Sequence, residues 1–384
     1  MRLSLHRSEA RTRSRSLAAV CFALCAALTA SACSSSSSPA AGPSGSASLV
    51  DTASAHSKLL PYLGHPSAFP EDNALGQHPA AGSKFVYLQC STPICALIGT
   101  LLAGPTKALG VSLTIVNSGS SATSSQAAAA TAMADKPAAV LLPAVDPQIF
   151  GASIKQMTAA GIAVTGVGII DGEAYGVPVS EGGEASIALA GQLLADWVVS
   201  QKGGASNTVF FGTPELNFTP TMQAGFKSEM AQVCGSCATA YQSIPIATFG
   251  NTAPSAVVSY LQAHQKVNTV VFASMEAATG LAAALKDAGI HVTTVGFAPT
   301  PSNLQDIKNG GLTAGLGLDL LVQEWNQVNL AARQLAHESI TPAELDPDLE
   351  FLTQGDVTAA DTSQGWTGYP DVAQRFEKLW TPAG

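Results

Sequence analysis

The chain has 384 residues, of which 46% are hydrophobic and only 12% charged, with a formal net charge of −9. Because this acidic balance repels phosphate backbones, the composition argues against nucleic-acid binding. A chain of this length exceeds one typical hydrophobic core, so we expect two domains.

The first 32 residues are typical of a secretory signal peptide. Five arginines precede an apolar run at 17–28, and the small residues Ala30-Ser31-Ala32 follow it. This run is too short to span a membrane, and no later stretch has the roughly 20 uninterrupted apolar residues that a spanning helix needs. We therefore expect residues 1–32 to be removed on export, which leaves a more acidic chain working outside the cytoplasm.

Cys33 stands directly after the small residues and before a run of serines at 34–38. This arrangement resembles the lipobox of bacterial lipoproteins, in which a diacylglycerol thioether forms on the new N-terminal cysteine. The resemblance implies that Cys33 is lipidated and anchors the protein to the outer face of the cell membrane. The family usually has Leu three residues before the cysteine, whereas this chain has Ala30. The alternative is an ordinary signal peptide cut near Ala32.

Residues 33–83 form the next segment, which lacks hydrophobic periodicity and is rich in Ser, Ala, Pro and Gly. We expect a flexible tether and an irregular lead-in, with order beginning at Lys84. His56, His65 and His78 lie in this segment without the close spacing of a metal site, so we expect them to be solvated. No metal site and no cofactor are expected.

From Lys84 onward, short β-rich runs alternate with helical runs. The expected strands are 85–89, 112–116, 138–142, 163–166, 208–211, 239–243, 269–273, 292–296 and 313–317. The expected helices include 94–109, 124–134, 148–160, 181–199, 219–234, 277–288 and 320–337, and the tail at 349–379 adds a strand and a short helix. Buried strands separated by helices predict an α/β fold with two doubly wound parallel-sheet lobes.

Four cysteines remain after Cys33, in the local pairs Cys90/Cys95 and Cys234/Cys237. In an oxidising compartment, close pairs of this kind indicate disulfides, with free thiols as the alternative. The second pair has the spacing of a redox motif. It lies at an expected helix end before a strand, which is not the context of such a motif.

Five short segments lie in order along this pattern: Thr92-Pro93-Ile94, 160–164, 223–226, 295–297 and 310–314. Together they resemble the type I periplasmic solute-binding proteins, and the ribose-binding branch in particular, over residues 84–352. The resemblance implies two lobes joined by three hinge crossovers, near 180–181, 318–319 and 339–348. The lobes would be 84–180 plus 319–340 and 181–318 plus 349–384.

The same resemblance implies a mechanism in which the lobes close on a small molecule at the carboxyl ends of the strands. A membrane permease powered by ATP hydrolysis then recognises the closed form. We expect a monomeric, non-enzymatic receptor of an ABC importer. A ligand-sensing partner of a membrane signalling protein is the alternative. An enzyme is not expected, because the sequence shows no nucleophile elbow, Walker motif or metal cluster.

At the positions where the ribose-binding branch holds its sugar with charged and amide side chains, this chain has mostly apolar or small residues. These positions are Thr92, Ile94, Leu142, Gly168, Met222, Ser274, Ala298 and, at the second crossover, Leu318 or Asp319. Each sugar hydroxyl left without a partner costs about 1–3 kcal/mol, so we expect an aromatic, terpenoid or otherwise largely apolar ligand. The alternative is a sugar held by relocated contacts, for which Glu215, Asn217, Asp146 and Asp171 are available.

Loop residues complete the candidate site. Phe218 and Phe249 lie where the family places stacking aromatics, with core packing as the alternative. Glu215 and Glu276 follow strand ends and could meet a polar group of the ligand, or be solvated charges. Trp325 is expected in the core rather than in the cleft.

Overall fold

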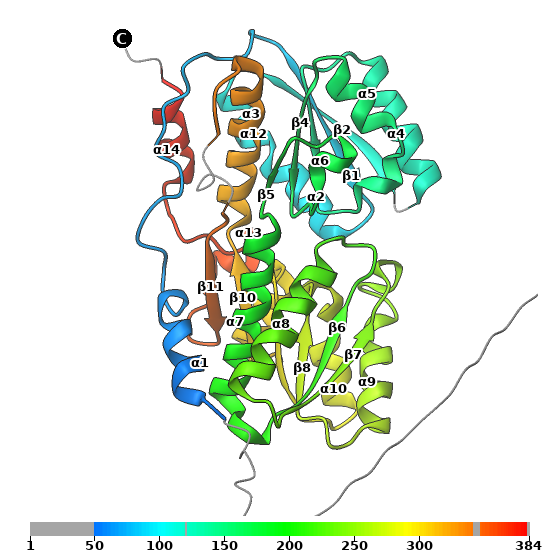
Figure 1. The fold of residues 1–384 in the computed structure, drawn as a ribbon, viewed down its shortest axis with the longest axis vertical. Coiled ribbons are helices and arrows are strands. Elements are labelled where there is room, and N and C mark those ends of the chain that lie inside the picture. The colour runs from blue at the N-terminus through cyan, green and yellow to red at the C-terminus, as the bar shows by residue number, and fades with distance from the viewer. Residues whose placement is uncertain (1–49, 120, 341–345, 382–384) are drawn as a thin grey trace, which may run out of the picture. The chain divides into compact units, whose positions relative to one another are not determined.

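The computed structural model describes residues 50–119, 121–340 and 346–381, which build two parallel sheets with helices packed against them (Figure 1). The signal peptide and Cys33 lie outside the described residues. The expected α/β fold of two parallel-sheet lobes is confirmed.

The first lobe is built on a five-stranded parallel sheet in the order β2-β1-β3-β4-β5. Its strands are β1 (Lys84–Cys90), β2 (Ser112–Gly119), β3 (Ala139–Leu142), β4 (Ala163–Val167) and β5 (Val179–Glu181). Its helices are α2 (Pro93–Leu101), α3 (Ala103–Ala108), α4 (Ala122–Ala134), α5 (Ser153–Ala159), α6 (Gly172–Tyr175) and α12 (Leu320–Ala336). Every residue of β3 and β4 is buried, as expected of parallel strands covered on both faces.

The second lobe is built on a four-stranded parallel sheet in the order β7-β6-β8-β9. Its strands are β6 (Asn207–Gly212), β7 (Ala238–Ser243), β8 (Thr269–Phe272) and β9 (Thr293–Gly296). Beside it, β10 (Ala314–Leu318) pairs antiparallel with β11 (Leu349–Thr353). The helices are α7 (Glu184–Lys202), α8 (Thr219–Val233), α9 (Ala253–Ala263), α10 (Leu281–Asp287), α11 (Pro301–Lys308) and α13 (Asp361–Gln364).

All the expected strands form within a few residues of their expected bounds, whereas β5 was not predicted. Three expected helices are interrupted. The helix expected at 94–109 divides into α2 and α3, because Pro105 has no N–H to donate to the carbonyl of Leu101. The helices expected at 148–160 and 277–288 are interrupted at Gly151 and Gly280, which have φ angles of 59° and 84°.

Helices α7 and α8 lie in direct backbone contact. A Cβ atom added at Gly191 would come within 2.0 Å of the carbonyl oxygen of Met222, and one added at Gly225 within 2.2 Å of the carbonyl oxygen of Ala188. Only glycine permits so close an approach. Met222 is therefore fixed in this core and fully buried. The sequence analysis expected it to contact the ligand, which is wrong.

Order begins before Lys84, because residues 52–62 are helical, whereas 63–83 form no helix or strand and are irregular as expected. Helix α1 (Thr52–Leu59) begins at Asp51, whose carboxylate accepts a hydrogen bond from the Ser54 N–H, and it buries Ala55 and Leu59 in the core of the second lobe. Lys58 Nζ lies 2.5 Å from Glu229 Oε1 on α8. A short amphipathic helix of this kind is stabilised by tertiary packing that its own sequence does not reveal.

After α1 the chain runs from the second lobe to the first, where it meets the end of the protein (Figure 1). Helix α14 (Val372–Leu379) packs on α12 of the first lobe, although the sequence analysis placed the whole tail in the second. Leu75 donates its N–H to the carbonyl of Leu379 over 2.9 Å, and the His78 ring bonds to the carbonyl of Trp380. Trp380 in turn stacks on Trp325, whose expected place in the core is confirmed.

Helix α12 carries a row of buried polar side chains. Gln327 Nε2 donates to the Leu142 carbonyl over 3.0 Å, at the end of β3. Farther along, Arg333 Nη1 lies 3.1 Å from Glu338, and Asn329 accepts a hydrogen bond from the Trp380 ring. The helix therefore joins the first sheet to the C-terminal helix.

Each of the three crossovers between the lobes carries a carboxyl group shielded from water: Glu181, Asp319 and Asp348. Burial raises the pKa of Asp348 to about 7, with the nearby charge of Asp319 adding to the effect. Burial also raises the pKa of Asp319 to about 6. The pKa of Glu181 is raised by burial and then by the charge of Glu324.

These carboxyls predict a stability that falls as the pH rises from about 4 to 7. An aspartate in the unfolded chain titrates near pH 3.9, so in this window the folded protein binds more protons than the unfolded chain. We expect Asp348→Asn to be more stable relative to the wild type at pH 8 than at pH 5, because only the wild type then holds a shielded charge there. Urea unfolding at both pH values measures this, with the exposed Asp287→Asn as control. An equal difference between wild type and Asp348→Asn at the two pH values would contradict the prediction.

Candidate ligand-binding site

A pocket lies between the lobes, where the carboxyl ends of β1, β3 and β4 face those of β8 and β9. Ligand sites of open parallel sheets form at this edge. The apolar side chains of its lining are Ile94, Ile98, Val145, Val167, Ile187, Leu216, Phe218, Ile246, Phe297, Leu318 and Leu320. Both lobes and the hinge contribute to this surface, so a bound molecule would be enclosed by hydrocarbon on several sides.

Few polar side chains interrupt the apolar lining. They are Thr92, Ser274, Glu276 and Gln323. Among the described lining residues there is no Lys, Arg or His, and no group of His, Cys, Asp or Glu that could hold a metal ion occurs in the described part of the chain.

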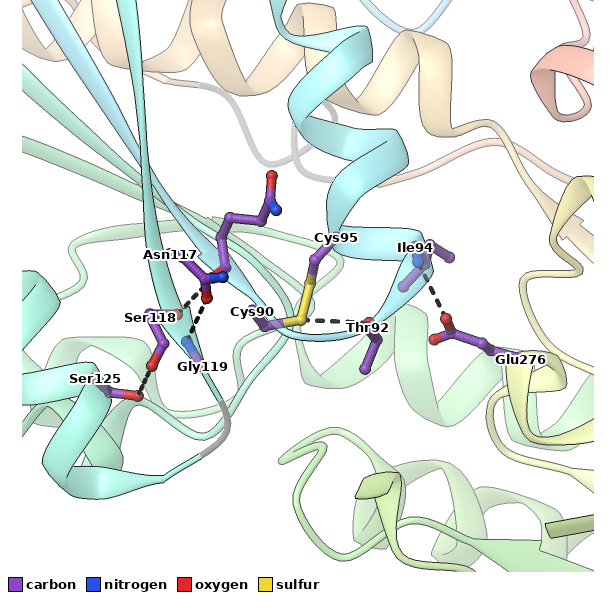
Figure 2. The surroundings of a disulfide bond; sticks show 10 residues. Cys90, Thr92, Ile94, Cys95, Asn117, Ser118, Gly119, Ser125 and Glu276 are labelled. Carbon is purple, nitrogen blue, oxygen red and sulfur yellow. Dashed lines mark hydrogen bonds between the residues drawn. A yellow bond between two sulfur atoms is a disulfide. The ribbon is translucent and has the colours of Figure 1, made fainter. Parts of the chain in front are cut away.

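A disulfide forms part of the pocket wall (Figure 2). Cys90 ends β1 and Cys95 lies in the first turn of α2, with an S–S distance of 1.95 Å. Thr92 precedes the helix and Pro93 opens it, a position at which the missing proline N–H is not needed. The disulfide therefore restrains the loop that presents Thr92 and Ile94 to the pocket. The second pair, Cys234–Cys237, is also bonded, at the end of α8 away from the pocket lining.

Glu276 links the two lobes at the edge of the pocket. It lies in a short 3-10 turn after β8, is only 3% exposed, and accepts a hydrogen bond from the Ile94 N–H over 3.1 Å (Figure 2). Burial raises the pKa of Glu276, while hydrogen bonds from Ile94 and Thr92 oppose this rise. Glu276 and Ile94 also line a neighbouring hollow with Thr300 and Ser302, so the contact separates the pocket from that hollow.

Gln323 lies in the first turn of α12, immediately after the second crossover, and is 4% exposed. Its side chain lines the pocket and has no hydrogen-bond partner among the described residues. Sequence analysis missed it, because the helical periodicity of 320–337 gives no reason to separate this residue from the core face. The Cys90–Cys95 disulfide, Ile98, Ile187 and Phe297 are further lining residues that were not proposed as ligand contacts.

The structure brings together about half of the residues proposed from the sequence. Those that line the pocket are Thr92, Ile94, Gly168, Phe218, Ser274, Glu276 and Ala298, together with Leu318, which was the alternative to Asp319 at the second crossover. The others lie elsewhere for identifiable reasons. Leu142 is fully buried beneath the pocket in the first lobe, and Phe249 packs against a core cluster of the second lobe.

Three proposed acidic residues are also placed outside the pocket lining. Asp146 and Asp319 accept hydrogen bonds from the backbone at the start of helical turns, from the N–H groups of Gln148 and Val322. Glu215 is exposed in the loop before α8. Capping a helical turn orients the Asp146 and Asp319 carboxylates toward backbone N–H groups rather than toward the pocket.

The comparison with known families decides the identity of the fold. The family model of the periplasmic binding protein domain matches residues 103–339. The chain belongs to the periplasmic binding protein family. It is a non-enzymatic solute-binding protein of the type I fold that works outside the cytoplasm, as the sequence analysis expected.

Solved structures of this family share the fold at low sequence identity. An ABC transporter solute-binding protein from Burkholderia graminis in complex with D-arabinose is 15% identical, with a TM-score of 0.65 over 74% of this chain and 99% of that one. The Caulobacter myo-inositol binding protein bound to myo-inositol is 16% identical, with a TM-score of 0.61 over 75% and 97%. A glucose-galactose binding protein from Geobacillus stearothermophilus is 16% identical, with a TM-score of 0.60 over 72% and 99%.

No curated protein sequence matches the chain significantly. Within the described residues, no helix of this periplasmic binding protein is both long and apolar enough to cross a membrane.

The disulfide in the pocket wall predicts a local effect on the pocket. We expect the double variant Cys90→Ala/Cys95→Ala to lose about 2 kcal/mol of unfolding free energy, because a short loop is no longer closed. Amide hydrogen exchange at Ile94 should accelerate, since its bond to Glu276 depends on the restrained loop. The variant Cys234→Ala/Cys237→Ala is the matched control and should leave exchange at Ile94 unchanged. Equal exchange at Ile94 in both variants would refute this role of the disulfide.

Proposed function

We propose that this protein is a lipid-anchored receptor that captures a small molecule less polar than a free sugar and delivers it to an ABC importer. The observation that carries the proposal is the apolar lining of the pocket between the lobes. The proposed ligand contacts are Thr92, Ile94, Gly168, Phe218, Ser274, Glu276 and Ala298.

The energetics of the pocket favour an apolar ligand over a monosaccharide. Each buried hydroxyl without a partner costs about 1–3 kcal/mol, and the four polar side chains of this lining offer few partners for the hydroxyls of a sugar. An apolar molecule would instead gain about 25 cal/mol for each Å² that it removes from water. Structures of similar fold bind D-arabinose and myo-inositol, so the ligand of this chain would differ in chemistry while sharing the site.

The two-lobed arrangement supports capture by closure. Because the pocket is lined from both lobes, a ligand that touches Ile94 on one side and Phe297 on the other favours the conformation in which the lobes enclose it. The three crossovers would act as the hinge. An importer that recognises this conformation would receive the ligand, and a lipid on Cys33 would keep the receptor at high effective concentration near the importer.

A thermal-shift screen tests the nature of the ligand. We expect aromatic or terpenoid compounds to raise the melting temperature, because a ligand at 100 times its Kd stabilises the folded state by about 2.7 kcal/mol. D-Ribose, D-galactose and D-xylose should not. Ala298→Asp should lower the affinity for the apolar ligand, because it adds a carboxylate to the pocket. Ala283→Asp, on the exposed face of α10, should leave this affinity unchanged. Binding of one of these sugars at micromolar concentration would refute the proposed ligand class.

Mass analysis of the mature protein tests the anchor. We expect a chain that begins at Cys33 and carries the mass of a diacylglycerol thioether, because a lipobox cysteine is modified before cleavage. Cys33→Ser should release the protein from the membrane fraction. An unmodified N-terminus at any other residue would exclude the anchor while leaving ligand binding untouched.

A further inference from the structure

Gln323 is exceptional among the buried amides of α12. The side chain of Gln327, one turn farther along, donates to the Leu142 carbonyl, and that of Gln334 both donates to and accepts from the backbone of Val164. Gln323 is 4% exposed, and its side chain lines the pocket without a hydrogen bond to a described residue. A ligand that displaces water from the pocket must replace the hydrogen bonds that water can make to this amide, so the counterpart of Gln323 is to be sought in the molecule that the pocket receives.

Glu276 has capacity left for a ligand beside its hydrogen bonds from Ile94 and Thr92. Its Oε1 atom accepts from the Ile94 N–H, but a carboxylate offers about four acceptor positions on its two oxygens and cannot donate when ionised. A ligand group that meets Glu276 must therefore donate a hydrogen bond.

The charge of the pocket restricts the ligand further. Glu276 is the one ionisable side chain among the described lining residues apart from the disulfide cysteines, which do not titrate. An anionic ligand would lie beside this carboxylate in an apolar enclosure without a cation to compensate, an arrangement that low dielectric surroundings make strongly unfavourable.

We propose that the ligand is a non-anionic, largely apolar molecule that carries a hydrogen-bond donor, with Glu276 accepting from that donor and Gln323 bonding a second polar atom or the same group. This inference rests on the proposed function and narrows its ligand class. It separates hydroxylated or amine-bearing compounds from two other classes. Hydrocarbons would leave Gln323 without a partner and Glu276 with only its protein partners, and carboxylates would be repelled by Glu276.

A matched ligand series on one skeleton tests the proposal in the mature protein. The probes are p-cymene, 4-isopropylbenzyl alcohol, 4-isopropylbenzylamine and 4-isopropylbenzoate, titrated by calorimetry at pH 7. We expect the alcohol or the amine to bind at least 10-fold more tightly than both p-cymene and the benzoate. The comparison of alcohol with amine shows whether a neutral or a cationic donor is preferred.

Two variants assign the preference to the proposed side chains. Glu276→Gln keeps an oxygen for the Ile94 N–H but removes the charge. It should therefore reduce the ratio of the affinity for the alcohol to that for the benzoate at least 5-fold. Gln323→Leu should lower the affinity for the alcohol about 5- to 10-fold, whereas the affinity for p-cymene should stay the same or rise. Asp287→Asn removes a charge from the exposed end of α10 in the same lobe and should change none of these ratios.

The possible failures are distinguishable. If all four probes bind within threefold of one another, or if the benzoate binds most tightly, the ligand class is wrong while apolar capture stands. If Glu276→Gln behaves like Asp287→Asn, Glu276 does not set the preference. If none of the four binds, this proposal is overturned, and binding of a sugar in the thermal-shift screen would overturn the proposed function with it.

Discussion

The buried polar side chains of α12 are the constraint on which the rest of the structure depends. Their hydrogen bonds cannot be exchanged for water without exposing the helix, so they fix its rotation against the first sheet. The same helix meets the lead-in and the C-terminal helix on its outer side and enters the pocket with Leu320 and Gln323. The shape of the pocket therefore follows from contacts made along a helix that contributes only its first turn to the ligand site.

The alternation of strands and helices could be predicted because short runs rich in β-branched residues alternate with segments of helical hydrophobic periodicity. What could not be predicted depends on distant contacts. Helix α1 is short and weakly apolar, and it is stable because Ala55 and Leu59 enter the core of the second lobe. Helix α14 likewise gains its place from Trp325, more than 40 residues earlier in the chain.

The residues of the candidate site also divide into those that the sequence could predict and those that it could not. Glu276 could be proposed from the sequence because it follows a strand, and the carboxyl ends of parallel strands meet at one edge of the sheet. Thr92 and Ser274 could be proposed because the family resemblance marks their positions as ligand contacts. Met222 and Leu142 could not be placed correctly, because helix rotation and the alternation of a strand decide which way a side chain points. Gln323 has no sequence signal of its own. Its significance appears only when the partners of the neighbouring amides are known.

The bond between Leu75 and Leu379 ties the segment that follows α1 to the C-terminal helix on the first lobe. Chain ends are normally where a protein frays and where proteases begin. Here α14 cannot detach without breaking its bond to Leu75 and uncovering the stacked rings of Trp325 and Trp380. A protein that works outside the cytoplasm meets proteases, and this arrangement holds the C-terminal helix closed against digestion.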